Sequence, residues 1–332
     1  MSSSRIRPAT HTPRSSAPVA ASLAFGAHTL RVRRAHGAAG FGTPCYRRRV
    51  RWLLVLWDID FTLINAGGVG TRLYQMVFRD MFGTELPGAA DMAGRTDRAI
   101  VLDTLARAGI PEPRKHLDQF LAKLAALAPT GHELAVLHSR ALPGAAAALD
   151  ALAAFAPGRD GAGRAGTGHG GLSPGRDGAS RAGTGHAGLS PGRDGPGDGP
   201  GDGATDVRVV QSVLTGNVRR MAEMKLGAVG LDANLDLETG AYGDSHEIRS
   251  ELVHLARGNA ARKYGREFAG TATVLVGDTP LDVAAARATG ARAVAVATGG
   301  TSADKLAESG ADAVLPDLTD TPAVLSAILA VP

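Results

Sequence analysis

Two carboxylates, Asp58 and Asp60, stand on alternate residues directly after a strongly apolar segment. Side chains of a strand alternate between its faces, so these two would share a side and can converge where the strand ends. A second apolar segment further along the chain ends in Asp278, with Asp282 four residues later. Carboxylates that converge need a cation or a shared proton. The pattern therefore indicates a metal site beside a nucleophile.

Each of these acidic residues, taken singly, has an ordinary structural explanation. An Asp at the end of a strand is commonly a turn former or a helix N-cap. Two apolar segments that both end in Asp, with the sequence Thr215-Gly216-Asn217 between them, are harder to explain in this way. We therefore interpret the set as functional.

Short apolar runs alternate with longer amphipathic segments along most of the chain. We predict strands at 52–57, 207–214, 273–277, 292–297 and 313–315, and a short one near 235–238. We predict helices at 144–155, 217–228, 247–264, 280–289, 303–309 and 321–329. This alternation predicts an α/β fold, a Rossmann-like parallel sheet covered by helices on both faces. Ligands of such sheets bind at the carboxyl ends of the strands, where Asp58, Thr215 and Asp278 fall.

The region after the first strand contains no convincing strand for about 80 residues. Apolar residues recur there at helical spacing, among them Leu73, Met76, Val77 and Met81, and we interpret them as core packing. We predict an α-helical domain at 67–141, inserted into an α/β core formed by 51–66 and 142–332.

Taken together, these motifs resemble those of the haloacid dehalogenase-like (HAD) hydrolase superfamily, and among its members the phosphoglycolate phosphatase-like ones with a helical cap. Residues 58–62, Asp-Ile-Asp-Phe-Thr, resemble the first motif, D-x-D-x-T, although glycine is common where Phe61 stands. Thr215 at the end of a strand resembles the second motif, and residues 277–282 resemble the fourth, G-D-x-x-x-D. The resemblance implies that the inserted helices form a cap that closes over the substrate.

The resemblance also implies a Mg²⁺-dependent phosphatase that acts on a small phosphorylated metabolite. Asp58 would be the nucleophile that becomes an aspartyl phosphate, and Asp60 would be the general acid and base. Mg²⁺ prefers carboxylate, carbonyl and water ligands, and Asp58, Asp60 through its carbonyl, and Asp278 would supply them. Asp282 would lie behind them and orient a water or a cationic side chain.

Residues from two loops are expected to bind the phosphate. Thr62 and Thr215 offer hydroxyl groups, and Gly216 and Asn217 open the next helix, whose N-terminal dipole favours anions. Thr215 would at the same time suit a plain helix N-cap.

Two cationic roles depend on weaker signals. The third family motif is a Lys or Arg before the fourth-motif strand, and the usual Lys-Pro pattern is missing here. We favour Arg249, whose guanidinium can clamp a phosphate, over Lys225, which we interpret as a residue of a solvated helix face or as a snorkelling residue. In the predicted cap, Arg95 could bind a second anionic group, or residues 94–97 could simply start a helix with Thr96 as its cap.

Charge is distributed unevenly over the 332 residues. Residues 1–51 contain ten Arg and no acidic residue, so the rest of the chain has 26 basic and 32 acidic residues. Because the folded part is mildly acidic, we expect no nucleic-acid partner. Residues 1–50 read as a disordered extension, although a secretory signal or a transit peptide would share some of their features. Cys45 is the only cysteine and no apolar run is long enough for a membrane span, so we expect a cytoplasmic protein without a membrane partner.

A near-repeat of 17 residues occupies 157–206. Each unit is dominated by glycine and has a single Leu, so it cannot bury enough apolar surface to fold. Both full units contain G-x-G-x-x-G, which resembles a dinucleotide fingerprint. Neither copy follows a predicted strand or opens a predicted helix, so we interpret the segment as a low-complexity insert within the core.

Three other functions fit part of this pattern. A haloacid dehalogenase needs no acid at the position of Asp60 and is disfavoured. A phosphosugar mutase of the β-phosphoglucomutase type uses both carboxylates and a cap, so the residues leave it open. A HAD-fold protein that binds or regulates without turnover would have no use for the intact acidic set.

Overall fold

The computed structural model describes residues 50–88, 90–158 and 206–331. The basic N-terminal segment and nearly all of the 17-residue repeat lie outside these residues, so the predictions made for them stay predictions.

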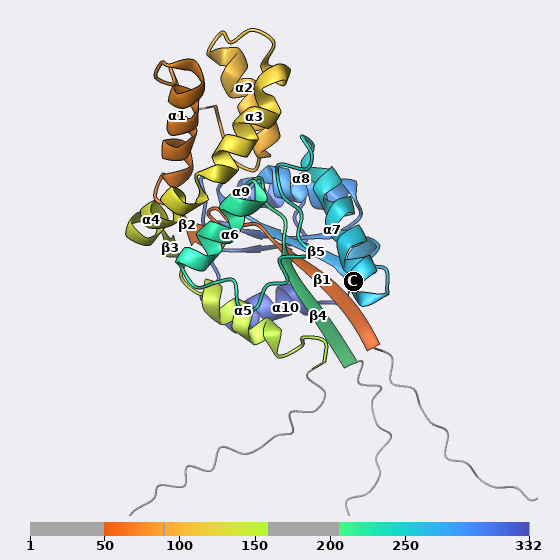
Figure 1. The fold of residues 1–332 in the computed structure, drawn as a ribbon. Coiled ribbons are helices and arrows are strands. Elements are labelled where there is room, and N and C mark those ends of the chain that lie inside the picture. The colour runs from red at the N-terminus through yellow and green to blue at the C-terminus, as the bar shows by residue number, and fades with distance from the viewer. Residues whose placement is uncertain (1–49, 89, 159–205, 332) are drawn as a thin grey trace, which may run out of the picture. The chain divides into compact units, whose positions relative to one another are not determined.

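Five parallel strands form the central sheet, in the order β4-β1-β5-β6-β7 (Figure 1). Their bounds are β1 Val50–Trp57, β4 Asp206–Val213, β5 Thr273–Gly277, β6 Arg292–Val296 and β7 Ala313–Leu315. These are the five main predicted strands, and each end lies within two residues of its predicted position. The α/β fold is therefore confirmed.

The sixth predicted strand, near 235–238, is wrong. The segment forms turns instead, in which Thr239 donates its N–H to the carbonyl of Asp236 at 3.1 Å. In the part of the chain that the structure describes, one backbone hydrogen bond joins it to the sheet, from the N–H of Asp236 to the carbonyl of Gln211 in β4 at 2.8 Å. The alternating Leu and acidic residues resemble a strand, but local turn bonds satisfy their backbone in place of a ladder.

Both faces of the sheet are buried, because each apolar strand sends alternate side chains to opposite sides. Leu53, Val55 and Trp57 of β1 join one core cluster, and Leu54 and Leu56 join the other. The first face is covered by α5 (Ala145–Ala153), α6 (Arg219–Ala228) and α10 (Thr321–Leu329). The second is covered by α7 (Arg249–Tyr264), α8 (Pro280–Ala288) and α9 (Ala303–Glu308). These are the six predicted helices of the core, with ends that differ from prediction by two residues at most.

Four further helices form a separate group, here called the helical group (Figure 1). They are α1 Val69–Phe82, α2 Asp97–Arg107, α3 Pro113–Ala126 and α4 Ala128–His138. A short antiparallel pair, β2 (Ile64–Asn65) and β3 (Arg140–Ala141), stands where the chain enters and leaves the group. The group has its own apolar core, to which α6 contributes Met221 and Met224, and the residue before it, Val218, also contributes. It therefore packs directly on the carboxyl end of the sheet.

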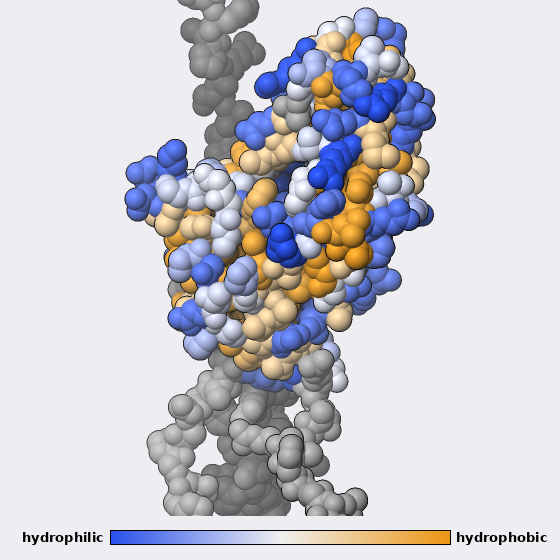
Figure 2. Space-filling model, turned by 90° about the vertical axis from the view of Figure 1, so that its left-hand side faces the viewer, coloured by the Kyte–Doolittle hydropathy of each residue, from blue (hydrophilic) through white to orange (hydrophobic). Residues whose placement is uncertain are grey.

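One residue of the predicted apolar stripe lies outside this core. Leu73 and Val77 of α1 are buried, whereas Met76 is 41% exposed. Positions 73 and 77 are one turn apart on the same face, and position 76 is rotated from that face toward solvent. Figure 2 shows that apolar side chains lie among hydrophilic ones over this side of the molecule.

Among the described residues, no single helix is long and apolar enough to cross a membrane. The pair α3 and α4 reaches that length and hydropathy only together, and it is bent by 58°.

Candidate active site

The order of the strands brings together the three loops that carry Asp58, Thr215 and Asp278. β1 lies between β4 and β5, and Trp57 pairs with Val213 on one side and Val276 on the other. The residues that follow these strands are therefore neighbours, and Asp58 donates its N–H to the carbonyl of Val276 at 2.8 Å. Asp58, Thr215 and Asp278 lie at the same edge of the sheet, as parallel strands require.

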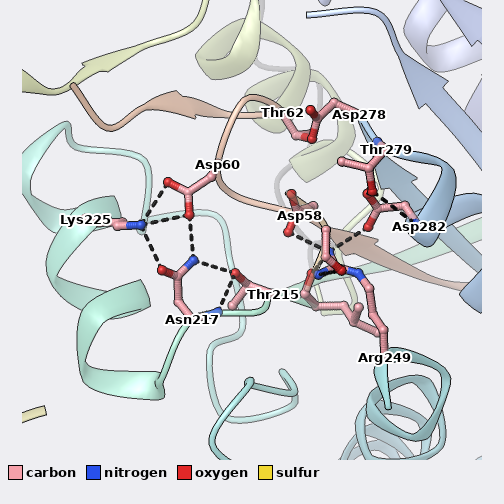
Figure 3. A network of polar contacts seen from close by, with 12 residues as sticks. Asp58, Asp60, Thr62, Thr215, Asn217, Lys225, Arg249, Asp278, Thr279 and Asp282 are labelled. Atoms are coloured by element: carbon pink, nitrogen blue, oxygen red, sulfur yellow. Dashed lines mark hydrogen bonds and ion pairs between the residues drawn. The ribbon is translucent and has the colours of Figure 1, made fainter. Parts of the chain in front are cut away.

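Three carboxylates form a buried cluster at this edge (Figure 3). Asp58, Asp278 and Asp282 each offer an oxygen within 4.8 Å of the other two. Burial raises the pKa of Asp58 well above its ordinary value, an effect that Arg249 opposes and Asp282 and Asp278 reinforce. Burial, followed by the charge of Asp282, raises the pKa of Asp278 to about 7. Ionised carboxylates are unfavourable here unless further positive charge is present.

Arg249, the first residue of α7, supplies one such charge. Its Nη2 lies 2.7 Å from Asp58 Oδ1 and 2.6 Å from Asp282 Oδ1, and its Nη1 donates to the carbonyl of Gly94 at 3.1 Å. Burial by itself would lower the pKa of this guanidinium, but the charges of Asp282 and Asp58 raise it. Arg249 therefore stays charged and ties two of the three carboxylates together.

The two strand-end carboxylates fit a divalent cation better than Asp282 does. Asp282 Oδ2 already accepts the Thr279 hydroxyl at 2.6 Å and the Thr279 N–H at 3.1 Å, which caps α8, and its Oδ1 faces Arg249. Asp278 has one side-chain donor among the described residues, the hydroxyl of Thr62 at 3.3 Å. A Cβ at position 299 would lie 1.8 Å from Asp278 Oδ2, so the glycine there leaves room for the Asp278 carboxylate. Oxygen donors with free lone pairs are what Mg²⁺ requires.

Asp60 belongs to a second polar group beside the first (Figure 3). Lys225 Nζ lies 2.8 and 2.7 Å from its two carboxylate oxygens, and Asn217 Nδ2 donates to Oδ2 at 2.7 Å. Lys225 also donates to Asn217 Oδ1 at 2.8 Å, so the three side chains form a closed triangle. This triangle turns the Asp60 carboxylate toward Lys225.

The prediction of a solvated position for Lys225 is wrong, because this residue is only 4% exposed. It lies on the buried face of α6 with Met221, Ala222 and Leu226. Its spacings of four residues from Met221 and three from Ala222 were the signal in the sequence that places it there.

Thr215, Gly216 and Asn217 form the turn that leads into α6. The buried Thr215 hydroxyl accepts the N–H of Asn217 at 3.2 Å and its Nδ2 at 2.7 Å. α6 begins at Arg219, two residues later than predicted, so Asn217 precedes the helix. A Cβ at Gly216 would lie 1.8 Å from the carbonyl of Arg95, so glycine permits the helical group to approach this turn.

The sequence did not point to Asp97, the first residue of α2. Its carboxylate accepts the Tyr74 hydroxyl at 2.5 Å and the N–H of Val218 at 2.7 Å. It therefore occupies the N-terminal dipole of α6 that was expected to serve a phosphate. Burial raises the pKa of Asp97 to about 6, although both hydrogen bonds oppose this shift.

Arg95 borders the site but is already engaged. Its Nη1 lies 2.9 Å from Asp103 Oδ2, and Nη2 donates to the carbonyl of Ala99 at 3.2 Å. Thr96 accepts the N–H of Ala99 at 3.3 Å as the cap of α2, as the helix-start interpretation predicts. In this arrangement the guanidinium of Arg95 stabilises the start of its own helix.

Phe61 adopts a left-handed backbone conformation, with φ of 59°. Glycine reaches this region at the least cost, which explains its frequency at this position in the family that the motifs resemble. The side chain is 48% exposed and lines the site, so it contributes to the entrance.

The two polar groups open into one cavity of about 820 Å³. It lies between the ends of the strands and the helical group, and residues of both line it. This volume suits a small molecule.

Comparisons with known proteins give one family match and several solved structures of similar fold. A family model described as HAD-hydrolase-like matches residues 253–321. No curated protein matches the chain. A solved structure of a predicted phosphatase from Clostridium acetobutylicum has a TM-score of 0.50 and 12% identity, with 83% of this chain and 99% of that one covered.

Two further solved structures have similar coverage. A hydrolase from Pseudomonas syringae has 18% identity and a TM-score of 0.49, with 84% of this chain and 98% of that one covered. A haloacid dehalogenase-like hydrolase from Streptococcus pneumoniae has 12% identity and a TM-score of 0.47, with 82% and 98% covered. Residues 253–321 are therefore similar to the HAD-hydrolase-like family, and the chain shares its fold with the Clostridium structure.

Proposed function

We propose that this protein is a Mg²⁺-dependent phosphatase that hydrolyses a small phosphate monoester through an aspartyl phosphate. The observation that supports this most directly is the buried cluster of Asp58, Asp278 and Asp282 at the carboxyl edge of the sheet, with Arg249 beside it. We also infer, from the single cysteine, that it acts in the cytoplasm.

Asp58 and Asp278, with the backbone carbonyl of Asp60, would hold the metal. When bound, Mg²⁺ would neutralise charge on the phosphate and on the carboxylates that approach it. Asp282 would hold Arg249 and cap α8, as its contacts with Arg249 and Thr279 indicate.

The reaction would proceed in two displacements. A carboxylate oxygen of Asp58 attacks phosphorus, the bond from phosphorus to the ester oxygen breaks, and Asp60 gives its proton to the leaving alkoxide. Asp60 then takes a proton from a water that attacks the aspartyl phosphate, and this step releases phosphate and regenerates Asp58.

The remaining polar residues would bind the phosphate oxygens. Arg249 is already 2.7 Å from the nucleophile and can donate to a phosphate at the same point. Thr215, Gly216 and Asn217 line this end of the cavity, whereas the predicted ligand Thr62 is fully buried and donates its hydroxyl to Asp278 at 3.3 Å. We propose that the helical group acts as the cap, since it closes the cavity over this end.

Lys225 is expected to position Asp60 for proton transfer. Replacing it with methionine removes both contacts to the Asp60 carboxylate, and we expect kcat for an alkyl phosphate to fall by about 10²-fold. The effect on p-nitrophenyl phosphate should be much smaller, because nitrophenolate leaves without a proton. Lys123→Met, in an exposed pair with Asp80, is the matched control. Equal losses on both substrates would instead indicate a purely structural role.

Mg²⁺ affinity is expected to rise with pH up to about 7. Because the pKa of Asp278 is raised to about 7, the folded protein without metal favours its protonated form and loses stability as pH rises from about 4 to 7. Below pH 7, Mg²⁺ must displace that proton, so its apparent Kd should weaken by up to about tenfold per pH unit. Thermal unfolding with increasing Mg²⁺ at pH 5.5, 6.5 and 8 measures this. In Asp278→Asn the metal-induced stabilisation should be small at every pH, and wild-type-like stabilisation would contradict the assignment.

A steady-state assay with p-nitrophenyl phosphate, with and without Mg²⁺, tests the function itself. Release of inorganic phosphate that requires Mg²⁺ supports the phosphatase. Conversion of a sugar phosphate to its isomer with little phosphate release would indicate a mutase and not a phosphatase. If no phosphate ester is turned over, the proposed activity is wrong.

A further inference from the structure

The charges around the cavity limit what the alcohol part of the substrate can carry. Among the described residues that line the cavity, five are acidic and three are basic. The acidic residues are Asp58, Asp60, Asp91, Asp97 and Asp278, and the basic ones are Arg95, Lys225 and Arg249. The transferred phosphate is itself an anion, so it needs the positive charge that these basic residues supply.

All three basic side chains of this lining are already paired with carboxylates. Arg249 lies between Asp58 and Asp282, and Lys225 contacts both oxygens of Asp60. Arg95, the basic residue on the helical group, is paired with Asp103 at 2.9 Å and donates to the backbone carbonyls of Asp91 and Ala99. A second anionic group on the substrate would have to break one of these pairs.

Carboxylates of the helical group lie on the side of the cavity where the alcohol part must fit. Asp97 is buried, and its two described hydrogen-bond donors are the uncharged Tyr74 hydroxyl and Val218 N–H. With a pKa of about 6 it is mostly ionised at pH 7. Asp91 is exposed at the rim. An anionic group placed here would be repelled, and the cost grows as water is excluded.

The rest of this wall is uncharged. Glycines and apolar side chains form much of it, among them Leu73, Ile100, Leu124 and Met221 from α1, α2, α3 and α6, and Met92 from the loop before α2. Such a surface favours an uncharged, partly apolar group and supplies no unpaired positive charge to a second anion.

We propose that the substrate is a phosphate monoester of an alcohol that carries no negative charge. This inference rests on the proposed phosphatase function and narrows it. It excludes esters such as phosphoglycolate, whose alcohol part bears a carboxylate, although the sequence motifs resemble those of phosphoglycolate phosphatases.

Two matched pairs of substrates test the inference with the full-length protein and Mg²⁺. Phenyl phosphate and 4-carboxyphenyl phosphate differ by one carboxylate, and so do glycerol 3-phosphate and 3-phosphoglycerate, in which it replaces a CH₂OH group. We expect kcat/KM to be at least about tenfold higher for the uncharged member of each pair, which corresponds to about 1.4 kcal/mol. Equal or higher values for the carboxylate members would overturn the inference and leave the phosphatase function standing. No turnover of any ester, p-nitrophenyl phosphate included, would overturn both.

One variant tests whether the engagement of Arg95 is the cause. Asp103→Asn removes the charge that pairs with Arg95, and Asp103 does not line the cavity. We expect this variant to hydrolyse phenyl phosphate as the wild type does and to gain severalfold in kcat/KM for 4-carboxyphenyl phosphate. The control is Asp118→Asn. Asp118 is an exposed residue of α3 that pairs with Arg98, and its replacement should change neither value. An unchanged preference in Asp103→Asn would contradict the explanation from charge pairing.

Discussion

Replacing Asp58 with asparagine is expected to lower kcat by on the order of 10⁴-fold or more while the protein stays folded. The amide has nearly the shape of the carboxylate, but it is a poor nucleophile and cannot form the aspartyl phosphate. The fold should tolerate the change, because burial already makes the charge of Asp58 unfavourable and its raised pKa reflects this. The amide oxygen can still accept the hydrogen bond that Arg249 donates.

Steady-state kinetics and thermal unfolding of the same preparation separate the two effects. Asp80→Asn, an exposed residue of α1 paired with Lys123, is the control and should match the wild type in both. Rapid quenching with a ³²P-labelled substrate should trap labelled wild type and no labelled Asp58→Asn. Metal-dependent turnover that survives in Asp58→Asn would remove Asp58 as the nucleophile.

Removal of divalent metal is expected to abolish turnover, and Mg²⁺ should restore it. The reason is electrostatic, since Asp58, Asp278 and Asp282 lie within 4.8 Å of one another and Arg249 supplies a single positive charge among them. A phosphate dianion brought to this point would be repelled unless a cation is added. Activity after treatment with EDTA, followed by dialysis and addition of Mg²⁺, measures the requirement.

The residue dependence of this requirement gives a sharper test. Asp278→Asn should raise the Mg²⁺ concentration for half-maximal activity by 10-fold or more, because one anionic ligand is lost. Asp312→Asn, on the loop that precedes β7, lies outside the cavity and should leave that concentration unchanged. Full activity of the wild type after complete metal removal would rule out the proposed chemistry, whatever the variants do.

Much of the fold that positions the candidate site residues could be predicted from the sequence. The apolar segments that become β1, β4 and β5 each stop at a polar residue, and strand ends of one parallel sheet lie at one edge. The meeting of Asp58 with Asp278, 220 residues apart in the chain, follows from that rule. The exception, at 235–238, is a place where two Leu residues on alternate positions imitate a strand while turn bonds satisfy the backbone.

Which basic side chain pairs with which carboxylate could not be predicted in the same way. Arg249 and Lys225 both follow the second motif, yet Arg249 reaches Asp58 and Lys225 reaches Asp60. The choice depends on how α6 and α7 are rotated against the sheet, and their packing on opposite faces sets that rotation. Arg95 is a third case, since it precedes α2 and its partner Asp103 lies within α2, which draws the guanidinium onto that helix.

The amino-acid sequence alone was enough to predict the layered α/β fold and the edge of the sheet where the acidic residues gather, and it supports the chemistry proposed for them. It could do so because periodicity and strand ends are local properties of the chain. The tertiary structure alone decided which cation faces which carboxylate, and it brought Asp97 of the helical group to the N–H of Val218. These contacts join elements far apart in the chain, so their geometry depends on the packing of whole helices and on no local signal.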